Sequence, residues 1–191
     1  MRLLRHADRR RFPWKNGGGE MADVASAPDG AGWDDLQWRV GMAWIDRSGP
    51  FSDYPLIDRT LMVLDGPGIV LDVQGMPSAR LTTDVPPHVF PGDAPTDCRL
   101  IATPTVVLNA MTRRGAWGHR MRRERMAGAT SVAADGPLLL FLIQGSMSVE
   151  DTPLDRFDAV LLESGEAARF EARSAIVARV ALSEGTPGAE P

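Results

Sequence analysis

The sequence predicts an all-β protein built from two related halves, and three observations support this prediction. Apolar side chains occupy every second position across residues 36–46, which is typical of a strand with one buried face. The 19 glycines and 15 prolines divide the chain into short segments, which favours strands over long helices. The strand pattern of the first half also recurs in the second half.

Apolar runs bounded by turn residues predict further strands along both halves. In the first half these runs are residues 60–64, 68–73, 79–82, 99–102 and 105–111. In the second half they are residues 138–143, 146–150, 159–162, 167–172 and 175–182. Strands at this spacing are typical of a sandwich or a barrel.

The internal repetition can be followed residue by residue. Residues 61–66 and 140–145 are both apolar strands that end at a glycine turn, at Gly66 and at Gly145. Two related β-barrels explain this repetition, and an unrelated pair of β segments with similar turns remains the alternative. The stretch 112–128 joins the halves as a short helix or an exposed strand. We therefore expect a first half at residues 1–115, a second half at 116–183 packed with it as one compact unit, and a flexible tail at 184–191.

Composition excludes several classes of protein. The net charge of −4 and the isoelectric point near 5.4 argue against a general nucleic-acid binder. The single cysteine, Cys98, cannot form an intrachain disulfide. The N-terminus lacks the apolar region of a signal peptide, and no apolar run approaches the roughly 20 residues of a membrane helix. We expect a cytoplasmic protein with neither nucleic acid nor membrane as a partner.

Two clusters combine glycine with polar or aromatic residues. Trp14, Lys15 and Asn16 precede three consecutive glycines, which indicate a backbone that passes close to a ligand or to another strand, with a flexible hinge as the alternative. Gly49-Pro50-Phe51-Ser52 is a turn that enters an extended segment, and the Asp58-Arg59 pair after it is interpreted as a surface ion pair.

A third cluster lies on the strand predicted at residues 105–111. Asn109 and Met111 share one face of that strand, and Arg113 joins them if the strand continues. An asparagine between apolar neighbours is either a buried amide with its hydrogen bonds satisfied or a donor that points into a cavity.

The histidines give no metal-binding pattern. His6, His88 and His119 are far apart in sequence, and no His-x-His, His-Glu-x-x-His or cysteine pair is present. His88 and His119 could each act as a general base, although the sequence supplies no carboxylate to orient either ring. We therefore expect no metal, no cofactor and no identifiable catalytic constellation.

Taken in order, these clusters resemble the HutD/Ves family of cupin-like proteins. The resemblance covers about residues 12–115 and rests on Trp14-x-Asn16-Gly17-Gly18-Gly19, Trp38-Arg39, Gly49-Pro50-Phe51-Ser52, Asp58-Arg59, Phe90-Pro91-Gly92-Asp93 and Leu108-Asn109-x-Met111-x-Arg113-Arg114-Gly115. It implies an all-β bicupin, that is, two cupin-like (RmlC-like jelly-roll) β-barrels in one compact chain, without the usual metal ligands.

The resemblance also implies a function, namely binding of a small polar or carboxylate metabolite with a regulatory role in histidine utilisation. N-formylglutamate and urocanate are the candidate ligands by this association. The residues expected to line one pocket are Trp14, Asn16, Arg39, Ser52, Arg59, Asn109, Met111 and Arg113. The arginines would offer planar forks to a carboxylate. The chain departs from the family pattern at Met21, Gly41 and Leu56, where the family tends to have a hydroxyl residue, Ser and Gly.

Two other functions remain open at this stage. A metal-independent cupin enzyme, an isomerase or lyase using His88 or His119, would place one histidine beside a carboxylate in a barrel mouth. A stress-linked interaction protein would have filled barrels and a large exposed apolar patch. The oligomeric state, including a homodimer, is also left open.

Overall fold

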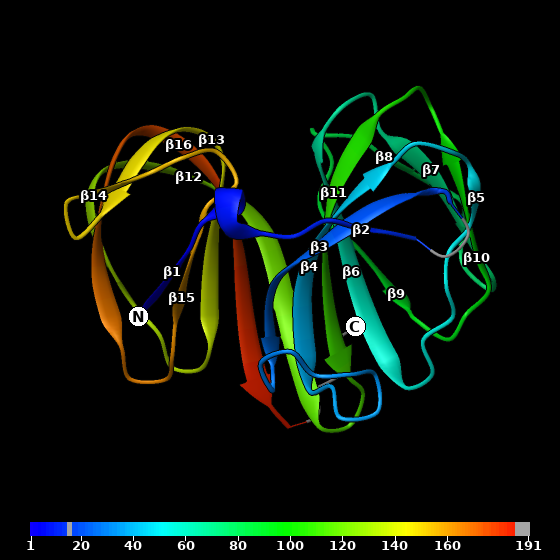
Figure 1. Ribbon diagram of the computed structural model, residues 1–191, viewed down its shortest axis with the longest axis horizontal. Helices are drawn as coiled ribbons and strands as arrows, with labels where there is room; N and C mark the ends of the chain where they lie inside the picture. Colours follow the sequence, from blue (N-terminus) through cyan, green and yellow to red (C-terminus); the bar gives the residue numbers. More distant parts are fainter. Residues whose placement is uncertain (15–16, 186–191) are drawn as a thin grey trace. The chain divides into compact units, whose positions relative to one another are not determined.

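The computed structural model describes residues 1–14 and 17–185 and confirms the all-β prediction (Figure 1). The one helical element among these residues is the short 3-10 helix η1 (His6–Asp8). The described part of the chain contains no helix with the length and hydropathy needed to cross a membrane. The chain divides into two compact units: the first is Arg10–Ala116, and the second combines Met1–Arg9 with the chain from Trp117 onward.

The first unit contains two antiparallel sheets. The six-stranded sheet has the order β2-β3-β4-β11-β6-β9, with bounds Phe12–Pro13, Gly19–Ala27, Trp38–Ile45, Thr105–Arg113, Ile57–Asp65 and His88–Pro91. The four-stranded sheet has the order β5-β10-β7-β8, with bounds Gly49–Pro50, Thr96–Leu100, Ile69–Val73 and Ala79–Leu81. Buried apolar side chains of both sheets, among them Ile45, Leu61 and Leu71, form one core.

Strand register decides which side chains share the inner face of the six-stranded sheet. Met111 lies opposite both Arg39 and Arg59, and Asn109 lies opposite both Gly41 and Leu61. Because side chains alternate between the two faces of a strand, every second residue of β4, β6 and β11 points to the same side. This alternation places the predicted polar residues on one surface.

The second unit is a single sheet of six strands. Its order is β1-β15-β13-β16-β12, and β14 pairs with β13. The bounds are Arg2–Leu4 for β1, Trp117–Ala133 for β12, Leu138–Val149 for β13, Thr152–Leu154 for β14, Ala159–Leu162 for β15 and Ala167–Glu184 for β16. Large buried side chains, including Leu140, Leu142 and Phe170, form its core.

Several predicted strands differ from the observed ones. The stretch 112–128 is not helical: it contains the end of β11 at Arg113, a turn at residues 114–116, and the part of β12 that begins at Trp117. The runs predicted at 138–143 and 146–150 are one bulged strand, β13, and those at 167–172 and 175–182 are one strand, β16. The run predicted at 99–102 lies earlier, in β10. Of the predicted tail, residue 184 ends β16, and residues 186–191 lie outside the described residues.

The glycines that the sequence pattern aligned have the same backbone environment. Gly66 has a φ of +90°, and a Cβ there would lie 2.3 Å from the carbonyl oxygen of Pro104. Gly145 has a φ of +97°, and a Cβ there would lie 1.9 Å from the carbonyl oxygen of Ser174. The turn predicted at Gly145 is wrong, because this residue lies within β13, but both positions require glycine for the same reason.

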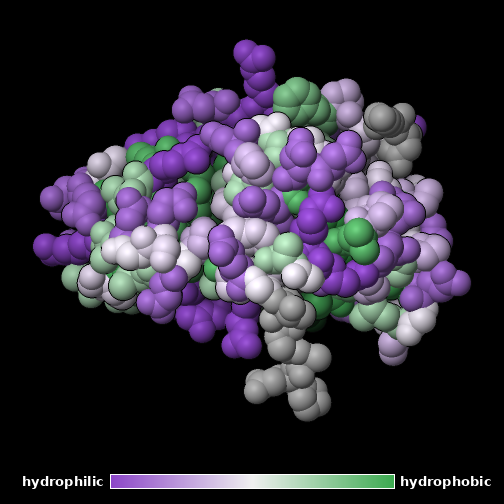
Figure 2. Space-filling model, turned by 90° about the horizontal axis from the view of Figure 1, so that it is seen from below, coloured by the Kyte–Doolittle hydropathy of each residue, from purple (hydrophilic) through white to green (hydrophobic). Residues whose placement is uncertain are grey.

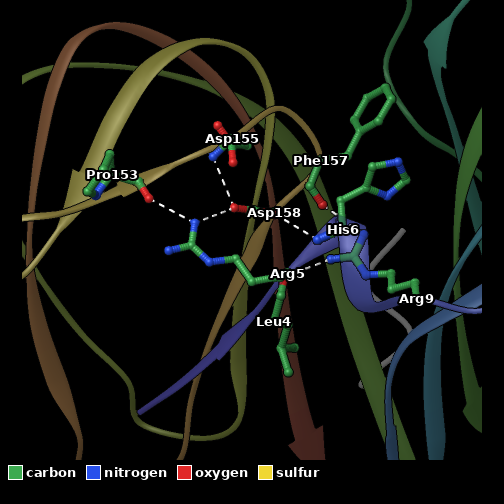
Figure 3. Close-up of polar contacts among 8 residues, drawn as sticks. All are labelled: Leu4, Arg5, His6, Arg9, Pro153, Asp155, Phe157 and Asp158. Carbon is green, nitrogen blue, oxygen red and sulfur yellow. Dashed lines mark hydrogen bonds and ion pairs between the residues drawn. The ribbon is translucent and has the colours of Figure 1, made fainter.

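Residues 1–9, which the sequence pattern placed with the first half, are attached to the second unit. β1 pairs with β15, and buried Asp158 accepts hydrogen bonds from the Arg5 guanidinium at 2.7 Å and the His6 amide at 2.7 Å (Figure 3). Arg9 donates to the carbonyl oxygens of Phe157 and Leu4. Burial alone would raise the pKa of Asp158, but its hydrogen bonds outweigh burial and hold the pKa below the ordinary value.

Candidate functional site

The first unit contains a cavity of about 820 Å³, within the usual size range of small-molecule sites. Seven of the eight predicted site residues line it: Trp14, Arg39, Ser52, Arg59, Asn109, Met111 and Arg113. The eighth, Asn16, lies outside the described residues. The sequence motifs therefore converge on one concavity for every predicted residue that the structure describes.

Arg59 is the most unusual member of this lining. Its side chain is 5% exposed, and its guanidinium carbon lies 5.1, 5.3 and 4.9 Å from the ring centroids of Phe51, Tyr54 and Phe90. The Nε atom is buried and has no hydrogen-bond acceptor among the described residues. Burial lowers the pKa of Arg59 to about 10, although its interaction with Tyr54 acts in the opposite direction. A buried cation without an acidic partner faces the cavity.

The predicted surface ion pair between Asp58 and Arg59 is wrong. Neighbouring residues on a strand point to opposite faces, so Arg59 points inward while Asp58 points outward. Asp58 instead accepts a hydrogen bond from the Nε of Arg114 at 2.8 Å. Arg114 also donates to both carboxylate oxygens of Asp93, which lowers the pKa of Asp93. Arg59 is left without a carboxylate.

Arg39 and Arg113 line the cavity and also donate to backbone carbonyls of residues 28–37, the loop between β3 and β4. Arg113 donates to the carbonyl oxygens of Leu36 at 2.7 Å, Trp33 at 2.6 Å and Asp34 at 3.0 Å. Arg39 donates to the carbonyl oxygen of Ala31 at 2.6 Å. Its Nε lies 3.5 Å from a carboxylate oxygen of Asp23, without a hydrogen bond. These two arginines hold the loop in place.

Four residues that no sequence motif indicated also line the cavity: Trp33, Asp34, Asp53 and Tyr54. The rings of Trp33 and Tyr54 are 4.1 Å apart with an interplanar angle of 34°, and the Arg39 guanidinium lies 4.4 Å from the Trp33 ring. These residues lie in two loops, 28–37 and 51–56, whose composition has no periodic pattern. Their position follows from the arginine contacts, which are visible only in the folded chain.

The remaining predicted residues supply smaller parts of the wall. Trp14 makes an edge contact with Phe51, with the ring centroids 6.1 Å apart. Met111 packs with Leu36 and Ile57 in a small apolar cluster. The Oδ1 of Asn109 is buried and has no hydrogen-bond donor among the described residues, so this atom does not fit the interpretation of a fully satisfied amide.

The glycine run near the cavity is explained by strand packing. A Cβ at Gly19 would lie 2.1 Å from the carbonyl oxygen of Trp44, in β4. The carbonyl oxygen of Gly18 accepts hydrogen bonds from the amides of Asp46 and Arg47. The sequence allowed either a close approach of the backbone or a flexible hinge at these glycines. At Gly19 the close approach to a neighbouring strand is the explanation.

Neither His88 nor His119 lines the cavity of the first unit. His88 lies on β9 and is not part of the cavity lining; its Nε2 is buried without a hydrogen-bond partner among the described residues, and burial lowers its pKa. His119 lies on β12, in the second unit. The described residues include no group of three or more His, Cys, Asp or Glu side chains that could hold a metal ion.

The surface offers little support for the interaction-protein alternative. Figure 2 shows a face dominated by hydrophilic side chains, with apolar side chains in small separate patches. The large apolar side chains exposed in the described part of the chain are Met1, Phe12, Trp33, Leu56 and Val89. Trp33 and Leu56 belong to the cavity lining.

Comparison with known proteins identifies the family. The sequence matches the HutD family over residues 6–178. This chain belongs to the HutD family. It is 38% identical over 101 residues to an uncharacterised 21.2 kDa protein in the hutC 3′ region of Pseudomonas putida, a match that covers 53% of this chain and about half (52%) of that relative. It is 27% identical over 152 residues to protein Ves of Citrobacter koseri, covering 78% of this chain and 77% of that one.

Solved structures of similar proteins have the same fold. A conserved protein of unknown function from Pseudomonas aeruginosa PAO1 matches with a TM-score of 0.82 and 30% identity, over 95% of this chain and 98% of that chain. HutD from Pseudomonas fluorescens SBW25 matches with a TM-score of 0.81 and 25% identity, over 96% and 98%. A cupin 2 conserved barrel domain protein from Leptotrichia buccalis, with a TM-score of 0.61, 8% identity and coverage of 90% and 92%, shares the fold alone. The chain belongs to the HutD family and has a cupin-like fold.

Proposed function

We propose that this protein is a metal-free bicupin that binds a small carboxylate metabolite in the cavity of its first unit. The observation that carries the proposal is Arg59, a buried arginine with three aromatic neighbours and no carboxylate partner. A buried charge without an opposite charge is costly, and a fold retains it where a ligand neutralises it. A carboxylate matches a guanidinium in both charge and planar geometry.

Binding at Arg59 requires little reordering of its side chain. The guanidinium is already fixed by its aromatic neighbours, so a ligand does not have to order a flexible side chain. A charge-assisted hydrogen bond contributes roughly 1.5–3 kcal/mol. Two such bonds to one carboxylate supply about 3–6 kcal/mol of the roughly 8 kcal/mol that micromolar binding requires, so apolar contacts with the walls of a preformed cavity must supply the rest.

The two-barrel architecture belongs to the same proposal. Gly66 and Gly145 occupy matching places in the two units, each at a close approach to the backbone of another strand. We interpret this as the trace of a duplicated cupin unit. A cytoplasmic location and a regulatory role in histidine utilisation are part of the same proposal, and the regulatory role is supported by membership of the HutD family and by the relative in the hutC 3′ region of Pseudomonas putida.

Isothermal titration calorimetry on the full chain tests the proposal. The ligands are a panel of small carboxylic acids that includes urocanate and N-formylglutamate, and the proteins are wild type, Arg59→Met and Arg125→Met. Arg125, an exposed arginine on β12, controls for the loss of one positive charge. We expect at least one acid to bind wild type and Arg125→Met equally and to bind Arg59→Met at least tenfold more weakly. Equal binding to all three proteins, or no binding in the panel, would contradict the proposal.

A further inference from the structure

We infer that the chain forms a two-fold symmetric dimer through the free edge of β12 in its second unit. The contact is the edge segment, residues 128–133, which follows the bulge between Met126 and Gly128. No residue of the edge segment lines the cavity of the first unit, so the dimer does not depend on the proposed function. Three features carry the inference: the unpaired edge, the exposure and lack of charge of the segment, and the charges at its two ends.

β12 lies at one end of its sheet and has a strand on one side only. Among the described residues it pairs with β16 alone, and the edge segment pairs with residues 167–172 of β16 in continuous register. In an antiparallel sheet, alternate residues direct their N–H and C=O groups to opposite sides of the strand. Half of these groups in the edge segment therefore point away from β16, where another strand can bind them.

The other edge strands of the described sheets have features that prevent pairing with another chain. Each is only two to four residues long, and four of them contain a proline, which lacks a backbone N–H donor. These strands are β1, β2, β5, β8, β9 and β14, with Pro13, Pro50, Pro91 and Pro153. In contrast, β12 is 17 residues long and contains no proline.

Charge protects only the first part of β12. Arg120, Arg122 and Arg125 are exposed before the bulge, and charged side chains oppose pairing at a strand edge. The edge segment after the bulge has no charged residue. A second strand can therefore approach it without meeting a charge.

The edge segment is also accessible from both faces of the sheet. Four consecutive residues are exposed: Gly128, Ala129, Thr130 and Ser131. Since successive side chains of a strand point to opposite faces, neither face is covered here. The side chains are small, which leaves space for a strand laid alongside.

A second copy of the chain fits this edge in an antiparallel pair centred on Thr130. Thr130 then lies opposite Thr130 of the other copy, and such threonine pairs are favourable across strands. Val132, which packs in the core of its unit, lies opposite Gly128. Residues opposite each other share a face of the sheet, so this register keeps the core sides of both copies together.

The charges at the two ends of the segment complement each other in this pair. Arg125 precedes the segment and Asp135 follows it, and both residues are exposed. Antiparallel pairing brings Arg125 of each copy toward Asp135 of the other. The two-fold arrangement also uses the free edge of both copies, so the assembly closes as a dimer and no further copy can add.

Sedimentation velocity of the full chain tests the inference with wild type, Thr130→Arg, Thr130→Glu and Thr152→Arg. Thr152, an exposed threonine on the edge strand β14 of the same unit, is the matched control. We expect wild type and Thr152→Arg to dimerise equally, with a micromolar dissociation constant because one strand pair is a small interface. Thr130→Arg and Thr130→Glu each place like charges opposite each other and should remain monomeric over the same concentrations.

Mixing the two charged variants separates repulsion from misfolding. An equimolar mixture of Thr130→Arg and Thr130→Glu should dimerise, because opposite charges then meet at the centre of the pair. A monomeric wild type, dimerisation of Thr130→Arg as strong as that of wild type, or loss of the dimer in Thr152→Arg would overturn the inference. Open-ended larger assemblies, or a mixture that stays monomeric, would overturn it as well.

Discussion

The rings of Trp33 and Tyr54 lie 4.1 Å apart, although the two residues belong to different loops. Trp33 is in the loop between β3 and β4, and Tyr54 is in the loop between β5 and β6. The first loop is held by Arg113, which accounts for three hydrogen bonds to its carbonyl oxygens. The wall of the cavity beside Arg59 therefore depends on a residue that is not expected to touch the ligand itself.

Replacing Arg113 with lysine tests this dependence. Lysine keeps the positive charge but lacks the planar fork, so it cannot reach three carbonyl oxygens at once. We expect faster hydrogen exchange at the amides of residues 31–36 and about tenfold weaker ligand binding, equivalent to about 1.4 kcal/mol. Arg120→Lys, at an exposed position on β12, is the control and should change neither. Unchanged exchange in Arg113→Lys would show that the loop does not depend on this arginine.

Arg59→Met is expected to stabilise the ligand-free protein while abolishing binding. Because burial lowers the pKa of Arg59 to about 10, its charged form destabilises the fold at every pH below that value, and the three aromatic contacts offset only part of the cost. Methionine fills similar space without a charge. Urea unfolding at neutral pH should show a gain of about 1–2 kcal/mol. A less stable variant would mean that Arg59 already has a compensating partner.

Leu56 is strained at the cavity wall, and glycine should relieve the strain. Leu56 has a φ of +60° and is 57% exposed, so its side chain gains little from burial. An L-residue in this left-handed conformation costs about 1 kcal/mol. We expect Leu56→Gly to be more stable than Leu56→Ala by about that amount, measured by urea unfolding. If Leu56→Ala is as stable as Leu56→Gly, the backbone at this position is not strained.

Gly19 is expected to tolerate no side chain. A Cβ there would lie 2.1 Å from the carbonyl oxygen of Trp44, so alanine must push β3 away from β4. We expect Gly19→Ala to lower the free energy of unfolding by about 2–3 kcal/mol. Gly32 has open space around its Cβ position, so Gly32→Ala should change stability by less than about 0.5 kcal/mol. Similar losses at both positions would contradict the steric explanation.

Asp158 is expected to stabilise the second unit in a pH-dependent way. Its pKa lies below the ordinary value, so its contribution is present at neutral pH and is lost as the pH falls through the pKa of the folded state. Asp158→Asn should lower the free energy of unfolding by about 2 kcal/mol at pH 7, with a smaller difference from wild type in acid. Asp97→Asn, at an exposed position on β10, is the control. A pH-independent difference would rule out the carboxylate as the cause.

The residues of this site are predicted through the resemblance to the HutD/Ves family. Strand alternation explains why three of them, Arg39, Asn109 and Met111, face the same cavity. The pairing partners of the arginines could not be predicted in this way. Arg113 donates hydrogen bonds to loop carbonyls that are distant in sequence. Arg59 and its neighbour Asp58 lie on opposite faces of the strand and differ in burial, and both differences depend on strand register and on contacts with residues distant in sequence.

The fold shows the same division between local and distant information. The all-β class follows from turn residues and alternation, and the strand at 36–46 closely matches β4. The bulges that join residues 138–150 into one strand depend on pairing with β16, so apolar pattern alone divided that strand at Gly145. The attachment of residues 1–9 to the second unit depends on buried Asp158, which has no signature in the local sequence.

The central claim is that the Arg59 guanidinium receives the carboxylate of a ligand. Nuclear magnetic resonance of the arginine Nε–Hε groups tests it most directly, because the Nε of Arg59 is buried and its signal is identified by its absence in Arg59→Met. During titration with the carboxylic acid that binds wild type in the calorimetric panel, we predict that this one signal shifts and saturates with the calorimetric affinity. A bound acid that leaves the Arg59 signal in place while another arginine signal shifts would contradict the account.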